Sequence, residues 1–267
     1  MNIVPIFAFW FVLTLYFIFQ GVYSLIFGGK ILIVSFWYFL IGWILLNIVL
    51  ITFIVIRKRN RKNITNLLLQ QSDNYKKSYL SKDNQYFIQT PLSLIHSQYI
   101  PIYGNKKMAY KIVFNNFFQK WITLLEIFPI FSLQLKSKDY LVDIKRVHPL
   151  SLRYKYKVYL NEKYIGKLEQ HKVFTKKRMK NLISYKFTTK DELYTIENKK
   201  FTTKTTVKDS YKNTVLSANR TFFDLLKKKQ TNMRGEKHKV TLSPSFAINE
   251  LWLAVYLQCI LDKQQKR

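Results

Sequence analysis

Acidic residues are scarce in this chain of 267 residues, which carries 44 Lys and Arg against 15 Asp and Glu. Residues 1–56 contain no Asp or Glu and a single Lys, so nearly all of the net charge of +29 lies in residues 57–267. This excess is greater than solubility requires, and it attracts polyanions such as anionic lipid or nucleic acid. The alternative is that the lysines reflect a compositional habit of the source and simply solvate the surface.

Cysteine, glycine and clustered histidine are also scarce. Cys259 is the only cysteine, so an intramolecular disulfide is excluded. The seven glycines form no phosphate-binding loop, nucleophile elbow or kinase signature. The histidines are far apart and lack the spacing of zinc or metalloprotease motifs. We therefore expect no enzyme, no metal and no cofactor. The histidines, which we expect to be structural or exposed, are His96, His148, His171 and His238.

Two long hydrophobic runs make up the uncharged part of the chain. They extend from Ile3 to Phe27 and from Ile31 to Ile56, with Gly28-Gly29-Lys30 between them. Each run exceeds the ~20 residues that a helix needs to cross a bilayer core. A cleaved signal peptide would be shorter and would begin with a basic segment, while buried core helices of a soluble protein rarely lack charge over such a length. Residues 1–56 are therefore predicted to form a two-helix transmembrane hairpin.

The basic residues after the second run predict its orientation. Positive charge accumulates on the cytoplasmic side of membrane helices, and the turn between the runs holds only Lys30. We expect a two-span protein of the cell membrane with both termini in the cytoplasm. The juxtamembrane basic cluster consists of Arg57, Lys58, Arg59, Arg61 and Lys62.

Composition divides the rest of the chain into a linker and a β-rich domain. Residues 57–84 are basic and polar, which predicts a juxtamembrane linker that is part helical. In residues 85–267 aromatic and β-branched residues dominate, and about twelve short strands are expected, which favours a barrel or a sandwich. The predicted strands are Tyr86–Gln89, Ile100–Tyr103, Met108–Phe114, Phe131–Leu135, Tyr140–Val147, Leu152–Leu160, Tyr164–Glu169, Leu182–Thr188, Leu193–Glu197, Phe201–Val207, Thr214–Ala218 and His238–Leu242.

Leu152–Leu160 has the clearest alternation among these strands. Its apolar residues would point inwards and its basic residues outwards, as in a half-buried strand. Asn161-Glu162-Lys163 is predicted to turn into a returning strand, where Gly166 marks a bulge or a close backbone contact. The outward basic residues are Arg153, Lys155 and Lys157.

The segment Phe246–Leu261 breaks the β pattern. It is apolar on nearly every side and follows the helix-start residues Ser243-Pro244-Ser245, so it must be a helix buried in protein or in lipid. It is short and polar for a third span, which would also place the basic tail outside the cell. We predict a core helix at about 246–261 that the strands surround. Asp262–Arg267 would then be its solvated exit.

Three segments resemble a known family. Ile100–Asn105, Tyr156–Gly166 and the helix around Ile248–Ile260 resemble small bacterial relatives of the tubby C-terminal-like fold, which tubby proteins, phospholipid scramblases and LURP-one-related proteins share. The resemblance covers about Tyr86–Leu261 and implies a twelve-stranded barrel around a central hydrophobic helix. It also implies a role at membranes, since tubby domains bind phosphoinositides and scramblases act on lipid. The chain lacks the cysteine-rich segment and the acidic calcium motif of scramblases, so no calcium site is expected.

Three functions follow, in order of preference. The first is a non-catalytic membrane protein whose basic domain binds anionic phospholipid headgroups or a membrane protein partner. The second is a component of lipid scrambling or transport in which the hairpin forms homo-oligomers, although no intramembrane acid or Arg marks a pathway. The third is nucleic-acid binding, which ranks last because the tyrosines and lysines of Leu152–Leu160 point to opposite faces. The candidate polyanion-binding residues are Arg57, Lys58, Arg59, Arg61, Lys62, Arg153, Lys155, Lys157, Lys176, Lys177 and Arg178.

Overall fold

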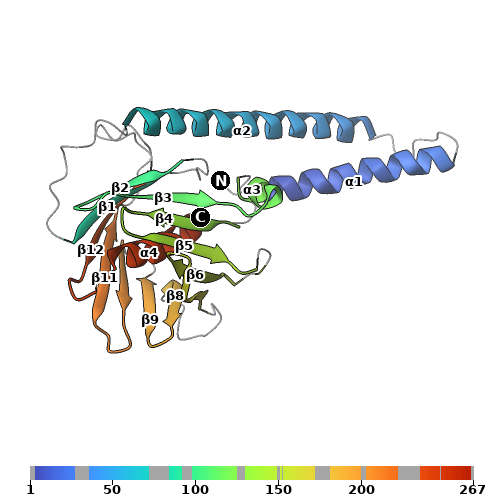
Figure 1. The fold of residues 1–267 in the computed structure, drawn as a ribbon. Coiled ribbons are helices and arrows are strands. Elements are labelled where there is room, and N and C mark those ends of the chain that lie inside the picture. Colours follow the sequence, from blue (N-terminus) through green and yellow to red (C-terminus); the bar gives the residue numbers. More distant parts are fainter. Residues whose placement is uncertain are drawn as a thin grey trace.

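The computed structural model consists of a helical hairpin and a closed β-barrel that surrounds a helix (Figure 1). This architecture agrees with the fold class predicted from the sequence. The structure describes residues 4–27, 36–71, 84–91, 98–124, 130–148, 151, 153–171, 181–199, 203–221, 235–246 and 248–265.

The hairpin is formed by α1 (Val4–Ile26) and α2 (Phe36–Gln71). Both helices are long and apolar enough to cross a membrane, with candidate spans at Ala8–Ile26 and Trp37–Asn66. Most of their large apolar side chains are exposed, as expected for helices that face lipid. Hydrogen bonds join the helices: Trp10 Nε1 donates to Asn47 Oδ1 at 3.1 Å, and Trp43 Nε1 donates to Thr14 Oγ1 at 3.1 Å. In an apolar environment such bonds hold helices together because no water competes for the polar groups.

α2 continues well beyond its apolar part. The predicted linker at 57–84 begins as the last turns of this helix, up to Gln71, and residues 72–83 lie outside the described residues. One side of this basic extension is partly buried, and Ile64 packs against the buried core residues of the barrel. The extension therefore lies alongside the barrel and connects it directly to the hairpin (Figure 1).

Twelve antiparallel strands form the barrel, and each strand pairs with its neighbours in the chain until β1 closes onto β12. Each of the twelve predicted strands overlaps one of them. Their bounds are β1 Gln85–Pro91, β2 Ile100–Tyr103, β3 Met108–Val113, β4 Ser132–Lys136, β5 Leu141–Arg146, β6 Lys155–Leu160, β7 Lys163–Gln170, β8 Asn181–Thr189, β9 Leu193–Lys199, β10 Lys204–Lys208, β11 Thr214–Arg220 and β12 Gly235–Leu242.

The C-terminal helix α4 (Asn249–Gln265) fills the barrel, which confirms the predicted core helix. Every residue from Asn249 to Lys263 is buried, because the inward side chains of the strands surround the helix on all sides. The predicted solvated exit is wrong for its first two residues. Asp262 and Lys263 are buried and hydrogen-bonded to the barrel wall, since the helix continues inside the barrel past Leu261.

The β6–β7 hairpin confirms the predicted turn. Asn161 and Glu162 have φ angles of 46° and 68°, the left-handed values that a two-residue hairpin turn requires. The register shifts between Val158 and Tyr159, next to the pairing of Val158 with Gly166. A Cβ at Gly166 would meet the carbonyl of Thr188 on β8, so this glycine permits a close backbone approach, as predicted.

Gly166→Ala is expected to lower the free energy of unfolding by about 1–3 kcal/mol, because the added methyl group forces β7 and β8 apart. Denaturant unfolding of the purified chain, followed by tryptophan fluorescence, to which the buried Trp252 contributes, measures this change. Gly42→Ala in α2 is the matched control, because nothing lies within 4 Å of the position that its Cβ would take. Equal unfolding midpoints for the two variants would contradict the close approach.

Candidate functional site

Lysines face one another across the outer surface of three neighbouring strands. Lys157 on β6 pairs in register with Lys145 on β5 and with Lys167 on β7. All three side chains point outwards, because the residues next to each of them along its strand point into the barrel. Like charges directly opposite each other destabilise a sheet, so this arrangement has a cost that an anionic ligand would remove. We call Lys145, Lys157 and Lys167 the lysine row.

Two carboxylates lie near the lysine row on the outer face: Asp143, two residues from Lys145 on β5, and Glu169, two residues from Lys167 on β7. Glu169 forms ion pairs with Lys167 and, at 3.5 Å, with Lys155. The hydrogen bond from Lys167 is the main reason that the pKa of Glu169 is lowered, and the charges of both lysines lower it further. Among the described residues, neither Lys145 nor Lys157 has a carboxylate within ion-pair distance. The surface therefore stays positive.

The row lies towards the rim of the barrel that carries α3 (Phe117–Leu124), the short helix between β3 and β4. Lys145 is the last residue but one of β5, and Lys155 is the first residue of β6. In this antiparallel barrel the end of β5 and the start of β4 are at the same rim, where the Arg146 backbone nitrogen donates to Ser132 Oγ at 3.2 Å. We call this rim the α3 rim.

The structure brings together only part of the predicted set of basic residues. Arg153 is exposed just before β6, and Lys155 and Lys157 follow on the outer face of that strand. The juxtamembrane cluster lies on a separate element, α2. Its members differ: Lys58, Arg59 and Lys62 are exposed, whereas Arg57 and Arg61 are partly buried. The predicted residues Lys176, Lys177 and Arg178 lie outside the described residues.

A second basic feature is a pocket of about 400 Å³ on the outer surface of the barrel. Phe87 and Tyr103 provide apolar walls, and Lys237 and Lys239 provide charge. In the register of β1 and β12, Lys239 lies opposite Phe87 and Lys237 lies opposite Gln89. Such a lining suits a ligand with an anionic group and an apolar part. Sequence reasoning missed this pocket because its walls come from strands far apart in the chain.

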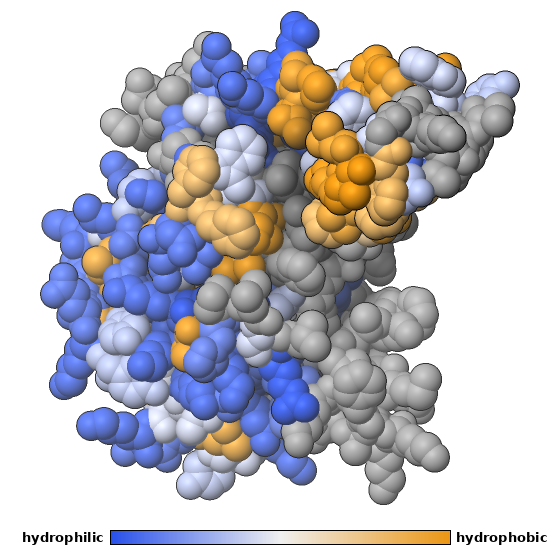
Figure 2. Space-filling model, turned by 90° about the vertical axis from the view of Figure 1, so that its right-hand side faces the viewer, coloured by the Kyte–Doolittle hydropathy of each residue, from blue (hydrophilic) through white to orange (hydrophobic). Residues whose placement is uncertain are grey.

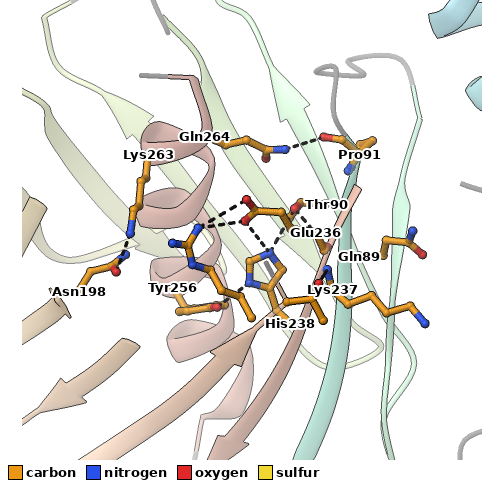
Figure 3. Close-up of polar contacts among 12 residues, drawn as sticks. Gln89, Thr90, Pro91, Asn198, Glu236, Lys237, His238, Tyr256, Lys263 and Gln264 are labelled. Carbon is orange, nitrogen blue, oxygen red and sulfur yellow. Dashed lines mark hydrogen bonds and ion pairs between the residues drawn. The ribbon is translucent and has the colours of Figure 1, made fainter. Parts of the chain in front are cut away.

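Inside the barrel, His238 on β12 belongs to a buried polar cluster (Figure 3). Its Nδ1 lies 2.8 Å from the hydroxyl of Tyr256 on α4, and its Nε2 lies 3.2 Å from Thr90 Oγ1 on β1. Arg220 on β11 places Nη1 3.3 Å from a carboxylate oxygen of Glu236 on β12. Burial raises the pKa of Tyr256, which therefore stays neutral. The cluster connects α4 to three strands.

Asp262 is the centre of a second buried cluster, near the C-terminal end of α4. Its carboxylate accepts hydrogen bonds from Tyr156 at 2.8 Å, from Tyr185 at 2.8 Å and from Gln258 at 2.9 Å. Burial raises the pKa of Asp262 to about 6, although these hydrogen bonds and the charge of Arg146 lower it. Desolvation therefore outweighs the hydrogen bonds.

Two further contacts hold the end of α4 in place (Figure 3). Lys263 Nζ donates to Asn198 Oδ1 at 2.7 Å, and Gln264 Nε2 donates to the carbonyl oxygen of Pro91 at 3.1 Å. The polar side chains of α4 thus join the helix to β1, β6, β8, β9 and β12. These contacts support a structural role for the buried polar groups. Within the described part of the chain, no three His, Cys, Asp or Glu side chains come together as a metal site requires.

The comparisons with protein-family models, with curated proteins and with solved structures found no significant match. The resemblance to the tubby C-terminal-like fold therefore stays a prediction. The description of the barrel, its core helix and the hairpin depends only on the structure itself.

Proposed function

We propose that this chain is an integral membrane protein whose basic barrel binds anionic phospholipid headgroups without catalysing a reaction. The lysine row is the observation that carries the proposal. Lys157 lies in register with both Lys145 and Lys167, only Lys167 of the row is paired with a carboxylate among the described residues, and such like charges call for a polyanionic partner. The hairpin supports it, since a membrane anchor keeps the barrel next to headgroups at high effective concentration. Each Lys or Arg close to an anionic surface contributes about 1 kcal/mol to binding.

The proposed orientation places the barrel in the cytoplasm. The exposed Lys58, Arg59 and Lys62 follow the apolar part of α2, where positive charge favours the cytoplasmic side of the cell membrane. Because the hairpin has two spans, the N-terminus lies on the same side. The anionic lipids of the inner leaflet are then the nearest polyanions.

Nucleic acid is the second candidate partner, and one observation favours it. Tyr156 points into the core, but Tyr159 and Tyr164 lie on the outer surface with their ring centroids 5.7 Å apart. Lys145 Nζ lies 5.1 Å from the ring centroid of Tyr159. Aromatic and basic side chains on one accessible face are what single-stranded nucleic acid requires. The test therefore includes RNA.

Flotation of residues 63–267 with lipid vesicles tests the proposal. We expect stronger binding to vesicles that contain phosphatidylserine than to pure phosphatidylcholine, and we expect added salt to remove this difference. Circular dichroism checks that this part of the chain is folded. Equal binding to neutral and anionic vesicles, or a clear preference for single-stranded RNA over anionic vesicles at the same salt concentration, would contradict the proposal.

Replacing the lysine row by glutamine, as Lys145→Gln, Lys157→Gln and Lys167→Gln together, is expected to weaken binding to anionic vesicles roughly a hundredfold. The matched control removes the same charge from exposed turns at the opposite rim of the barrel. It consists of Lys138→Gln, Lys190→Gln and Lys212→Gln. Equal losses in the two triple variants would show that net charge, and not the row, determines binding.

A further inference from the structure

The short helix α3 exposes aromatic side chains without an evident partner in the described structure. It follows a well-formed start: Asn116 Oδ1 accepts from the backbone nitrogen of Gln119 at 2.8 Å, and Gln119 Oε1 accepts from that of Asn115 at 3.2 Å. Asn116 is thus the N-cap of α3, and its side chain stabilises the first turn, while Gln119 ties the helix to the residue before the N-cap. α3 is therefore a regular helix, so its geometry determines which side chains face the barrel and which face away from it.

A surface helix of a soluble protein usually buries apolar side chains and exposes polar ones, whereas α3 buries a threonine and exposes aromatic side chains. Thr123 faces the barrel and is fully buried, and its Oγ1 bonds with both the carbonyl and the amide of Ile130 at 3.0 Å. On the outer side, Phe117 is 73% exposed, Phe118 69% and Trp121 46%. The rings of Phe117 and Trp121 contact each other edge to face, with centroids 5.8 Å apart. A contiguous exposed apolar patch of this kind marks a binding surface.

The position of α3 relative to the hairpin indicates what covers this patch. Along the direction of the hairpin, α3 lies level with the N-terminal end of α1, where that helix would enter the bilayer (Figure 1). Figure 2 looks along the hairpin from the end that is farthest from the barrel, and it shows apolar patches on and beside the hairpin on an otherwise largely hydrophilic surface. A bilayer that the hairpin crosses therefore has its cytoplasmic boundary at α3.

We propose that α3 is an interfacial anchor, whose aromatic side chains Phe117, Phe118 and Trp121 insert into the headgroup region of the bilayer that the hairpin crosses. Aromatic side chains, Trp above all, prefer this region because their rings are apolar and their edges are polar. Continuity with the hairpin favours lipid over a second copy of the chain as the occupant. Insertion fixes the α3 rim at the membrane and limits rotation of the barrel about its tether. It does not depend on headgroup charge.

The test places an environment-sensitive probe on the full chain in lipid nanodiscs. A nitrobenzoxadiazole label is attached at Phe118→Cys, and the native Cys259 is buried in α4 and shielded from labelling. We expect a blue-shifted emission that is quenched by spin-labelled lipid, in phosphatidylcholine discs as well as in anionic discs. The control label at Lys212→Cys, in the β10–β11 turn at the opposite rim, is expected to emit as in water and to resist quenching.

Two outcomes would contradict the proposal that α3 inserts into the bilayer. One is water-like, unquenched emission at Phe118→Cys. The other is a blue shift without lipid quenching that appears only with two chains per disc, because it would identify a second copy as the occupant. Neutral discs separate this test from the proposed function, since anionic-lipid binding by the lysine row can fail while α3 still inserts. Replacing Phe117 and Trp121 by serine in the labelled chain is expected to abolish the quenching.

Discussion

Arg220→Ala is expected to lower the free energy of unfolding by about 3–5 kcal/mol, well beyond the loss that an exposed substitution causes. Arg220 and Glu236 are both buried, with Nη1 3.3 Å from the carboxylate. Removing the guanidinium leaves the buried Glu236 carboxylate without its ion-pair partner, in a place that water reaches poorly. The damage would extend to His238, whose Nε2 lies 3.9 Å from the same carboxylate and whose Nδ1 contacts α4 through Tyr256.

Denaturant unfolding of the full chain in detergent micelles, monitored by tryptophan fluorescence and by far-ultraviolet circular dichroism, measures this loss. The control is Lys212→Ala, which removes a basic side chain from an exposed turn. Adding Glu236→Gln to Arg220→Ala is expected to recover part of the stability, because it removes the uncompensated charge. If Arg220→Ala lowers the free energy of unfolding no more than Lys212→Ala does, the buried Arg220–Glu236 pair does not stabilise the barrel.

The second large effect is a dependence of stability on pH that originates at Asp262. Its pKa is about 6 in the folded chain, whereas an unfolded Asp titrates near pH ~3.9. Between these values the folded chain binds the proton that the unfolded chain has released, so this group makes the fold more stable as the pH falls. The contribution is fully present below the unfolded pKa and is lost as the pH rises through about 6. The gain is on the order of 1 kcal/mol for each pH unit within that window.

Unfolding free energies at pH 7 and pH 5 for the native chain and for Asp262→Asn test this assignment. The native chain is expected to gain stability from Asp262 as the pH falls, while the variant lacks this contribution because the amide does not titrate. Asp139→Asn, an exposed substitution in the β4–β5 turn, is the control and is expected to keep the native pH dependence. Identical pH profiles for Asp262→Asn and the native chain would contradict the raised pKa.

Much of the fold could be predicted because local patterns determine it. The alternation in Leu152–Leu160 places Val158 inside and Lys157 outside, as the structure has them. The Asn161-Glu162 turn occurs where predicted, because these residues tolerate left-handed backbone. α3 was not predicted, since eight residues are too few for a helical period to stand out. The prediction that Asp262 is solvated was wrong because local polarity does not reveal how far a helix continues inside a barrel.

The candidate site was harder to predict than the fold. Alternation indicates that Lys155 and Lys157 face outwards, but the lysine row exists because Lys145 and Lys167 lie opposite Lys157 in the register of three strands. That register includes the irregularity between Val158 and Tyr159, which no local pattern specifies. Sequence therefore identifies the face on which a residue lies, and the fold identifies its neighbours.

Amine-reactive labelling of the full chain in nanodiscs tests most directly whether the basic barrel contacts anionic lipid. Mass spectrometry reports the modification of the lysine row and of the control lysines in phosphatidylcholine discs and in phosphatidylserine-containing discs. The control lysines are Lys138, Lys190 and Lys212. We predict that Lys145, Lys157 and Lys167 are protected only in the anionic discs, that high salt removes the protection, and that the control lysines react equally in both. Equal labelling of the row in neutral and anionic discs would contradict the account.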